Sequence, residues 1–207
     1  VSGVYHTVSS KKTLFVQAPT GVGKTMSAIF PSVRAIGEGK GETLFYLTAK
    51  TITGTVAWEA FHTLRENGLK FKVTAITAKE KLCFLDSPEC TPEKCPYAKG
   101  HFDRVNDAVY ELWTTEEVYS REVIRAHAEK WQVCPFEMCL DLSIWVDGII
   151  CDYNYVFDPN VHLKRFFGKN ISGDHIFLID DAPNLVERVR KMYSAGIFRQ
   201  YLVAFRK

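Results

Sequence analysis

Residues 18–25 of the chain read APTGVGKT, and they end a short apolar run at residues 13–18. The run predicts a buried strand, and apolar residues then recur at helical spacing over residues 23–36. Gly21 and Gly23 allow a loop whose N–H groups surround an anion, and the start of a helix favours negative charge. A glycine turn before an ordinary helix is the alternative interpretation, but a loop between a strand and a helix favours phosphate binding.

The loop predicts a nucleotide site. Lys24 can reach the β- and γ-phosphates of ATP, and the hydroxyl of Thr25 can bind Mg²⁺. The predicted ATP contacts are six consecutive residues, namely Thr20, Gly21, Val22, Gly23, Lys24 and Thr25.

Strand and helix patterns alternate beyond the loop. TLFYLT (43–48) and FKVTAI (71–76) predict strands, and residues 51–66 predict the helix between them. GIICDY (148–153) and HIFLID (175–180) predict two more strands. This order predicts a P-loop NTPase of the RecA-like α/β class, with a parallel sheet flanked by helices.

The alternation stops between residues 79 and 147. Residues 83–100 contain three cysteines and three prolines, residues 103–131 have a helical pattern, and residues 134–145 predict a short helix. The capping-box spacing of Thr114 and Glu117 predicts two helices within 103–131. We therefore expect a domain in two parts (1–78 and 148–190), an insert at 79–147, and the start of a further insert at 191–207.

Asp180 and Asp181 end the last predicted strand. Ligands bind at the carboxyl ends of strands in open α/β sheets, so Asp180 is the candidate Mg²⁺ ligand and Asp181 the candidate general base. Lys24, Asp180 and Asp181 are the expected catalytic residues, and two solvated acids at a loop start are the alternative.

Composition restricts the class of protein. The net charge of +2 does not by itself indicate a nucleic-acid partner, and no apolar run is long enough to span a membrane. The chain begins at Val1 without a secretory signal, which predicts a fragment of a monomeric cytoplasmic protein. In a reducing compartment, its clustered cysteines favour metal binding over disulfides.

LIDDAPNLVERVRKMYSA (178–195) resembles the second motif of XPD/DinG-type iron–sulfur DNA helicases. That family usually has Asp-Glu-Ala-His, whereas this chain has Asp-Asp-Ala-Pro at residues 180–183. The carboxylate of Asp181 falls about 1 Å short of a glutamate, and such a misplacement can cost on the order of 100-fold in rate. Pro183 also removes an imidazole and a main-chain donor. Nucleotide binding is therefore a firmer expectation than fast hydrolysis.

The cysteines extend the resemblance, which implies a [4Fe–4S] cluster held by Cys83, Cys90, Cys95 and Cys134. A structural zinc site is the alternative, although zinc favours paired Cys-x-x-Cys knuckles. Cys139 is the rival for the fourth position. Loss of the cluster is expected to leave residues 79–147 poorly ordered.

Residues 43–61 resemble a further helicase motif that faces DNA. The resemblance implies that Lys50, Thr51 and Thr53 contact phosphates, although helix capping by Thr51 and a solvated Lys50 explain the pattern equally well.

The whole resemblance implies part of the first motor domain of an ATP-dependent DNA helicase that uses ATP, Mg²⁺ and a [4Fe–4S] cluster. Its partners would be DNA, as a single strand or a fork, and a second motor domain that this chain lacks. Two alternatives stay open, namely a nucleic-acid-binding module with impaired hydrolysis and an unrelated P-loop ATPase with a zinc site.

Overall fold

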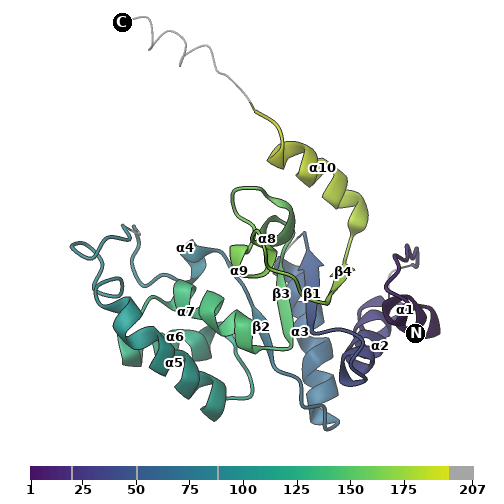
Figure 1. Ribbon diagram of the computed structural model, residues 1–207, viewed down its shortest axis with the longest axis horizontal. Coiled ribbons are helices and arrows are strands. Elements are labelled where there is room, and N and C mark those ends of the chain that lie inside the picture. The colour runs from purple at the N-terminus through teal and green to yellow at the C-terminus, as the bar shows by residue number, and fades with distance from the viewer. Residues whose placement is uncertain (20, 50, 88, 196–207) are drawn as a thin grey trace, which may run out of the picture.

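A parallel sheet of four strands organises the molecule (Figure 1). The computed structural model describes residues 1–19, 21–49, 51–87 and 89–195. The strands lie in the order β2-β3-β1-β4. Their bounds are Thr43–Thr48 for β1, Val73–Ala75 for β2, Gly148–Asp152 for β3 and His175–Ile179 for β4. The predicted parallel α/β architecture is confirmed, although β2 is shorter than the predicted strand.

The central strand β1 is buried on both faces, as its continuous apolar run predicts. Leu44 and Tyr46 point toward α2 (Lys24–Gly37) and α3 (Thr51–Glu66). Phe45 and Leu47 point to the opposite face, where they join the core of the insert. The predicted helices at 23–36 and 51–66 are therefore confirmed. Pro31 is buried inside α2 and does not shorten it.

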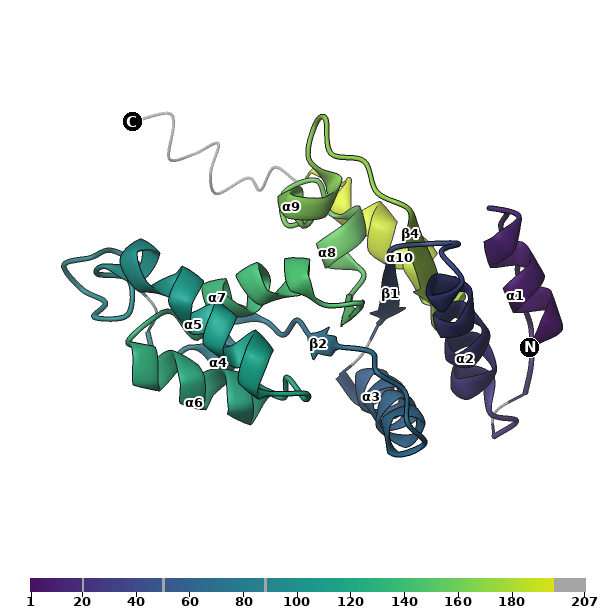
Figure 2. The same cartoon turned by 60° about the horizontal axis from the view of Figure 1, so that its bottom comes forward.

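The strand predicted at residues 13–18 is wrong. Residues 12–19 have no regular secondary structure, and the side chain of Phe15 is 88% exposed. This segment joins α1 (Ser2–Ser9) to α2, and α1 packs beside α2 (Figure 2). An apolar run becomes a strand only where it finds a hydrogen-bonding neighbour. No described residue pairs with the outer edge of β4.

The insert is mostly helical, as predicted. It contains α4 (Lys79–Leu82), α5 (His101–Thr115), α6 (Arg121–Trp131), α7 (Pro135–Leu142) and a 3₁₀ turn, η1 (Ser143–Trp145). The predicted division of residues 103–131 into two helices is confirmed, but the predicted capping box is wrong. Thr114 lies inside α5 and bonds back to the carbonyl of Tyr110. Ser120 caps α6 instead, by accepting a hydrogen bond from the N–H of Val123.

The insert shares one apolar core with the sheet. Leu112, Met138 and Leu142 are fully buried in the same cluster as Phe45 and Ile149 of the sheet. The insert helices therefore do not depend on bound metal alone for their packing.

Three further helices follow β3 in the described part of the chain. They are α8 (Asn154–Phe157), α9 (Lys164–Phe167) and α10 (Ala182–Met192), and α10 starts directly after the acidic residues that follow β4. Of the predicted segment 191–207, residues 196–207 lie outside the described residues.

Candidate functional site

The glycine loop has the backbone shape that the sequence predicts. Gly21 and Gly23 have φ values of 82° and 74°, a region that side chains other than glycine rarely adopt. Gly23 precedes α2 without any side-chain cap, which leaves the first N–H groups of the helix available to an anion. The ammonium of Lys24 donates to the carbonyl of Ala18 at 3.1 Å and so folds back over the loop. Val22 is exposed, and Thr20 lies outside the described residues.

Tyr46 lies near both the loop and the acidic residues. Its side chain, on β1, is close enough to Thr25 and Asp180 for both to affect its pKa. Burial, together with the nearby carboxylates, raises the pKa of Tyr46 well above its ordinary value. The fold thus brings the two predicted Mg²⁺ ligands near one tyrosine, although 155 positions separate them in the sequence.

The acidic turn is fixed mainly through its backbone. The N–H of Asp180 donates to the carbonyl of Leu47 at 3.0 Å, and the N–H of Asp181 donates to the Asp180 carboxylate at 3.1 Å. Asp181 has a left-handed conformation, with a φ of 50°, at the start of α10. Aspartate tolerates this region better than most residues. Pro183 lies in the first turn of α10, where a missing N–H donor has no intrahelical partner to lose.

A groove of about 1110 Å³ lies at the carboxyl ends of β1, β2 and β3. Its basic lining residues are Lys79, Lys81, Lys164, Arg165 and Arg188. Its aromatic lining residues are Trp58, Phe136 and Tyr155.

Acidic side chains hold part of this basic lining. Arg165 contacts the carboxylate of Asp141 at 2.7 Å, and Arg188 contacts that of Asp152 at 3.5 Å and also donates to the carbonyl of Ala49. The first turn of α3 adjoins the groove, because α3 begins at Thr51 and both Gly54 and Thr55 line the groove. Lys50 and the side chains of Thr51 and Thr53 lie outside the described residues.

The predicted cluster cysteines lie on segments that touch one another. Phe84 and Tyr97, which neighbour Cys83 and Cys95, have ring centroids 4.5 Å apart. The N–H of Cys134 donates to Nδ1 of His101 at 3.2 Å.

Lys79 lies near two of the four thiols. The proximity of Cys90, with a smaller contribution from Cys134, raises the pKa of Lys79. All four cysteines are free thiols, as a thiolate-bound centre requires. Within the described ranges, however, no three cysteine, histidine or acidic side chains lie close enough together to hold a metal ion. The donor chemistry fits a cluster, and the convergence of the four sulfur atoms stays a prediction.

The rival cysteine occupies a different environment. Cys139 is fully buried against β2, where its sulfur lies 3.9 Å from the hydroxyl of Thr74. Burial raises the pKa of the Cys139 thiol to about 12, which disfavours the thiolate that a metal ligand must become. Burial also raises the pKa of Cys134, but Cys134 is only half-buried, so it stays the candidate for the fourth position.

Several site residues were not predicted from the sequence. From the sequence, Tyr46 was predicted only to be part of a buried strand. The basic groove residues come from three separate segments, α4, α9 and α10. The one available signal was a tyrosine inside the apolar run TLFYLT, because a buried tyrosine hydroxyl usually finds a polar partner.

The described residues form a parallel α/β sheet with a glycine loop before α2 and an acidic turn after β4. Residues 66–202 match the DEAD_2 family. This match spans more than half of the sequence, and the chain belongs to the DEAD_2 family. The expected relationship to XPD/DinG-type helicases is thereby confirmed.

Individual relatives agree with this assignment. The chain is 26% identical over 98 residues to the Fanconi anemia group J protein homolog of Gallus gallus. That alignment covers 47% of this chain and 7% of the relative. Two solved structures, described as truncated XPD and XPD helicase, share the fold with TM-scores of 0.60 and 0.56 at 16% and 18% identity. Each superposition covers 92% of this chain, but only 53% and 32% of those structures. No helix among the described residues is long and apolar enough to cross a membrane.

Proposed function

We propose that this chain is the nucleotide-binding part of the first motor domain of an ATP-dependent DNA helicase. The observation that carries the proposal is that Thr25 of the loop and Asp180 after β4 both lie near the side chain of Tyr46. A P-loop hydroxyl and an acidic residue after a neighbouring strand are the pair that holds Mg²⁺ in P-loop NTPases.

Each residue has a distinct role in this proposal. The N–H groups of residues 21–25 and the ammonium of Lys24 hold the phosphates of ATP. Thr25 and Asp180 hold Mg²⁺, which supplies charge neutralisation at the phosphates. Asp181 orients the attacking water and accepts its proton. Since Asp181 follows Asp180 directly, one turn positions both functions.

The groove at the carboxyl ends of the strands is the proposed DNA path. Its lysine and arginine side chains suit phosphates, and aromatic rings such as Trp58 suit unstacked bases. Because most of the DNA contacts proposed here are contacts with phosphates, the affinity for DNA should fall steeply as the salt concentration rises. The groove begins beside α3, so the first turn of α3, with Thr51 and Thr53, adjoins this path.

The proposal includes a [4Fe–4S] cluster on Cys83, Cys90, Cys95 and Cys134. Four thiolates on a cluster supply a covalent joint between chain segments that otherwise meet through few contacts. The ammonium of Lys79 lies near Cys90 and would offset part of the negative charge of a bound cluster.

Nucleotide titration tests the proposal. A fluorescent ADP analogue with Mg²⁺ should bind the wild-type chain, and Lys24→Ala should weaken its affinity at least tenfold. Asp180→Asn should weaken only the Mg²⁺-dependent part of the affinity. Lys12→Ala is the matched control, because Lys12 is also an exposed lysine but lies outside the loop. Equal affinity in the wild type and the Lys24→Ala variant would exclude a nucleotide site at this loop.

One observation favours a second candidate function, a nucleic-acid-binding module with impaired hydrolysis. Asp181 is a short acid held in a left-handed turn, and Pro183 takes the place of the imidazole of related motifs. Nucleotide binding with no ATPase activity in the complete protein would support this candidate.

A further inference from the structure

Two arginines of the insert bind main-chain carbonyls instead of carboxylates. Within the described residues, neither Arg104 of α5 nor Arg125 of α6 forms a salt bridge. The guanidinium groups of both arginines donate hydrogen bonds to main-chain segments near the cysteines. A guanidinium presents several N–H donors in a rigid plane, so it fixes the relative positions of the carbonyls that it binds.

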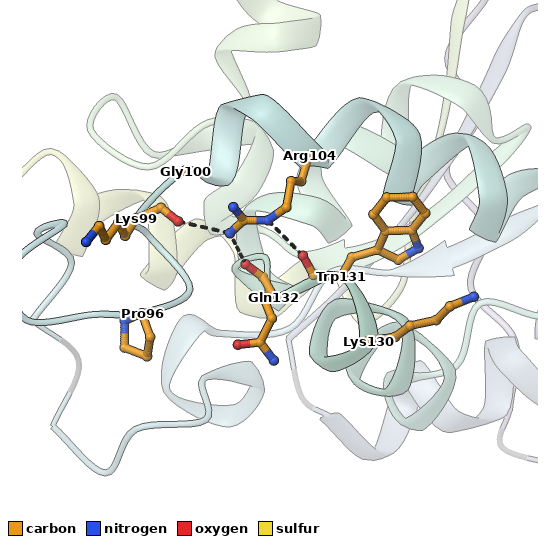
Figure 3. Close-up of a pocket in the computed structure, with 7 residues that line it drawn as sticks. All are labelled: Pro96, Lys99, Gly100, Arg104, Lys130, Trp131 and Gln132. Carbon is orange, nitrogen blue, oxygen red and sulfur yellow. Dashed lines mark hydrogen bonds between the residues drawn. The ribbon is translucent and has the colours of Figure 1, made fainter.

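Arg104 joins the segment after Cys95 to the segment before Cys134 (Figure 3). One of its terminal nitrogens, Nη2, donates to the carbonyl of Lys99 at 2.9 Å and to that of Gln132 at 2.6 Å. Its Nε donates to the carbonyl of Trp131 at 2.9 Å. Lys99 lies four positions after Cys95, and Gln132 two positions before Cys134.

This contact holds an unusual backbone conformation. Gln132 has a φ of 53° and ends α6 in the left-handed region, which costs free energy for a residue with a Cβ. The chain then turns into Cys134, whose N–H is bound by His101 from the same first turn of α5. Arg104 and His101 together set the direction from which Cys134 enters the site.

Arg125 acts on the first cysteine in the same manner. Its Nη1 donates to the carbonyls of Leu82 and Cys83 at 2.5 and 3.0 Å. Its guanidinium also lies over the ring of Phe84, 4.5 Å from the centroid, and Phe84 contacts Tyr97 beyond Cys95. The helical pair α5 and α6 therefore reaches three of the four cysteine segments through two side chains.

We propose that Arg104 and Arg125 are positioning residues for the iron–sulfur centre, because they hold the backbone around Cys83, Cys95 and Cys134 before the cluster is inserted. This inference rests on the proposed [4Fe–4S] cluster. Cys90 is exposed and has no such arginine contact among the described residues.

Cluster retention tests the inference. The full chain is purified without oxygen, iron and acid-labile sulfide are measured per chain, and the loss of cluster absorbance is followed after addition of an iron chelator. Substitution of groups that orient metal ligands typically costs 10- to 100-fold in metal affinity, so Arg104→Ala and Arg125→Ala should lose the cluster about 10- to 100-fold faster than wild type. Arg104→Lys should lose it at an intermediate rate, because one ammonium replaces a planar fork.

Arg65→Ala is the matched control. Arg65 also donates to a main-chain carbonyl of the insert, that of Glu117 at 3.3 Å, but no cysteine adjoins that contact. This variant should retain the cluster as the wild type does. Circular dichroism of each variant establishes whether its helices have formed.

The outcomes separate the two proposals. A wild-type chain without iron would overturn the cluster and this inference together. An iron-loaded wild type, with folded Arg104→Ala and Arg125→Ala variants that lose iron at the wild-type rate, would overturn this inference alone. If an alanine variant does not fold, the corresponding lysine variant decides, and wild-type retention in that variant would equally overturn the inference.

Discussion

The hydroxyl of Tyr153 donates a hydrogen bond to the main-chain carbonyl of Asp180. Tyr153 directly follows β3 and is fully buried, whereas Asp180 directly follows β4. Because β1 lies between these two strands, the bond passes across the end of β1. The acidic turn is therefore fixed from two strands, since the N–H of Asp180 also donates to Leu47 of β1.

The first prediction concerns this bond. Tyr153→Phe should lower the free energy of unfolding by about 1–3 kcal/mol, because it leaves a polar group without its partner. It should also weaken Mg²⁺-dependent nucleotide affinity by releasing Asp180. Tyr155→Phe is the control, since that hydroxyl donates to the carbonyl of Thr77 at 3.3 Å, away from the turn. Equal nucleotide affinities in the two variants would contradict a role for Tyr153 at the turn.

The second prediction concerns the length of the second acid. In the complete protein, Asp181→Glu combined with Pro183→His should raise the ATPase rate by up to about 100-fold, because the longer side chain restores about 1 Å of reach. The gain is measured at saturating ATP and DNA. Glutamate is strained in the left-handed conformation of residue 181, so the midpoint of thermal unfolding should fall slightly. An unchanged rate would show that the aspartate already suffices.

The third prediction concerns the close packing of Phe71 and Val73 against Gly148 of β3. A Cβ built at Gly148 would lie 2.9 Å from the ring of Phe71 and 3.2 Å from Val73. Gly148→Ala should therefore lower the free energy of unfolding by about 1–3 kcal/mol in a urea titration. At Gly37, which ends α2, a Cβ would meet nothing within 4 Å. Gly37→Ala should leave stability unchanged or slightly higher, and equal losses at both positions would refute this packing argument.

The fourth prediction concerns pH. The imidazole of His175 lies among the rings of Phe45, Phe166, Phe167 and Phe177, and neither ring nitrogen has a hydrogen-bond partner within the described part of the chain. Burial lowers the pKa of His175, against a smaller opposing effect of the Glu42 and Asp174 carboxylates. The unfolded chain therefore binds a proton more readily than the folded chain does.

Stability should be complete above the unfolded pKa of about 6.5 and should fall as the pH drops below it. Urea unfolding between pH 8 and pH 5 measures this slope. In His175→Phe the slope should be reduced, whereas His62→Gln should retain it, because His62 is exposed on α3. A slope that is identical in wild type and His175→Phe would exclude His175 as its source.

The fifth prediction revises an expectation drawn from sequence. The sequence led us to expect that residues 79–147 become poorly ordered without a cluster. The structure restricts that expectation to residues 83–99, because α5, α6 and α7 are held by buried residues such as Leu112, Ile124 and Met138. Hydrogen exchange of chelator-treated protein should show fast exchange in 83–99 and protection in the three helices. Fast exchange throughout the insert would restore the original expectation.

The sequence predicted strands from apolar runs both where the strand is buried, as in β1 and β3, and where alternate residues are exposed, as in β4. The runs that became β1, β3 and β4 are apolar over almost their whole length, and the helix after β1 follows at once. The run at residues 13–18 has the same local pattern, yet it remains exposed. Local pattern cannot distinguish these cases, because pairing depends on a neighbour elsewhere in the chain.

The candidate site was predictable only in part, for a related reason. Lys24, Thr25, Asp180 and Asp181 belong to two short motifs that can be read directly. Tyr46, Tyr153, Arg104 and Arg125 act through contacts with residues distant in sequence, and the arginines bind main-chain carbonyls, which carry no side-chain signature. Only the folded chain reveals such partners.

Residues 13–18 lead directly into the glycine loop. Among the described residues, the amides of 13–18 donate no main-chain hydrogen bond, whereas α2 is anchored on the sheet through Ile29 and Val33. The loop is thus held in place by α2 on its C-terminal side, but not by such bonds on its N-terminal side. The rate of deuterium uptake at these six amides should therefore report whether the glycine loop has a ligand. A ligand that stabilises the loop on its N-terminal side should slow the exchange there.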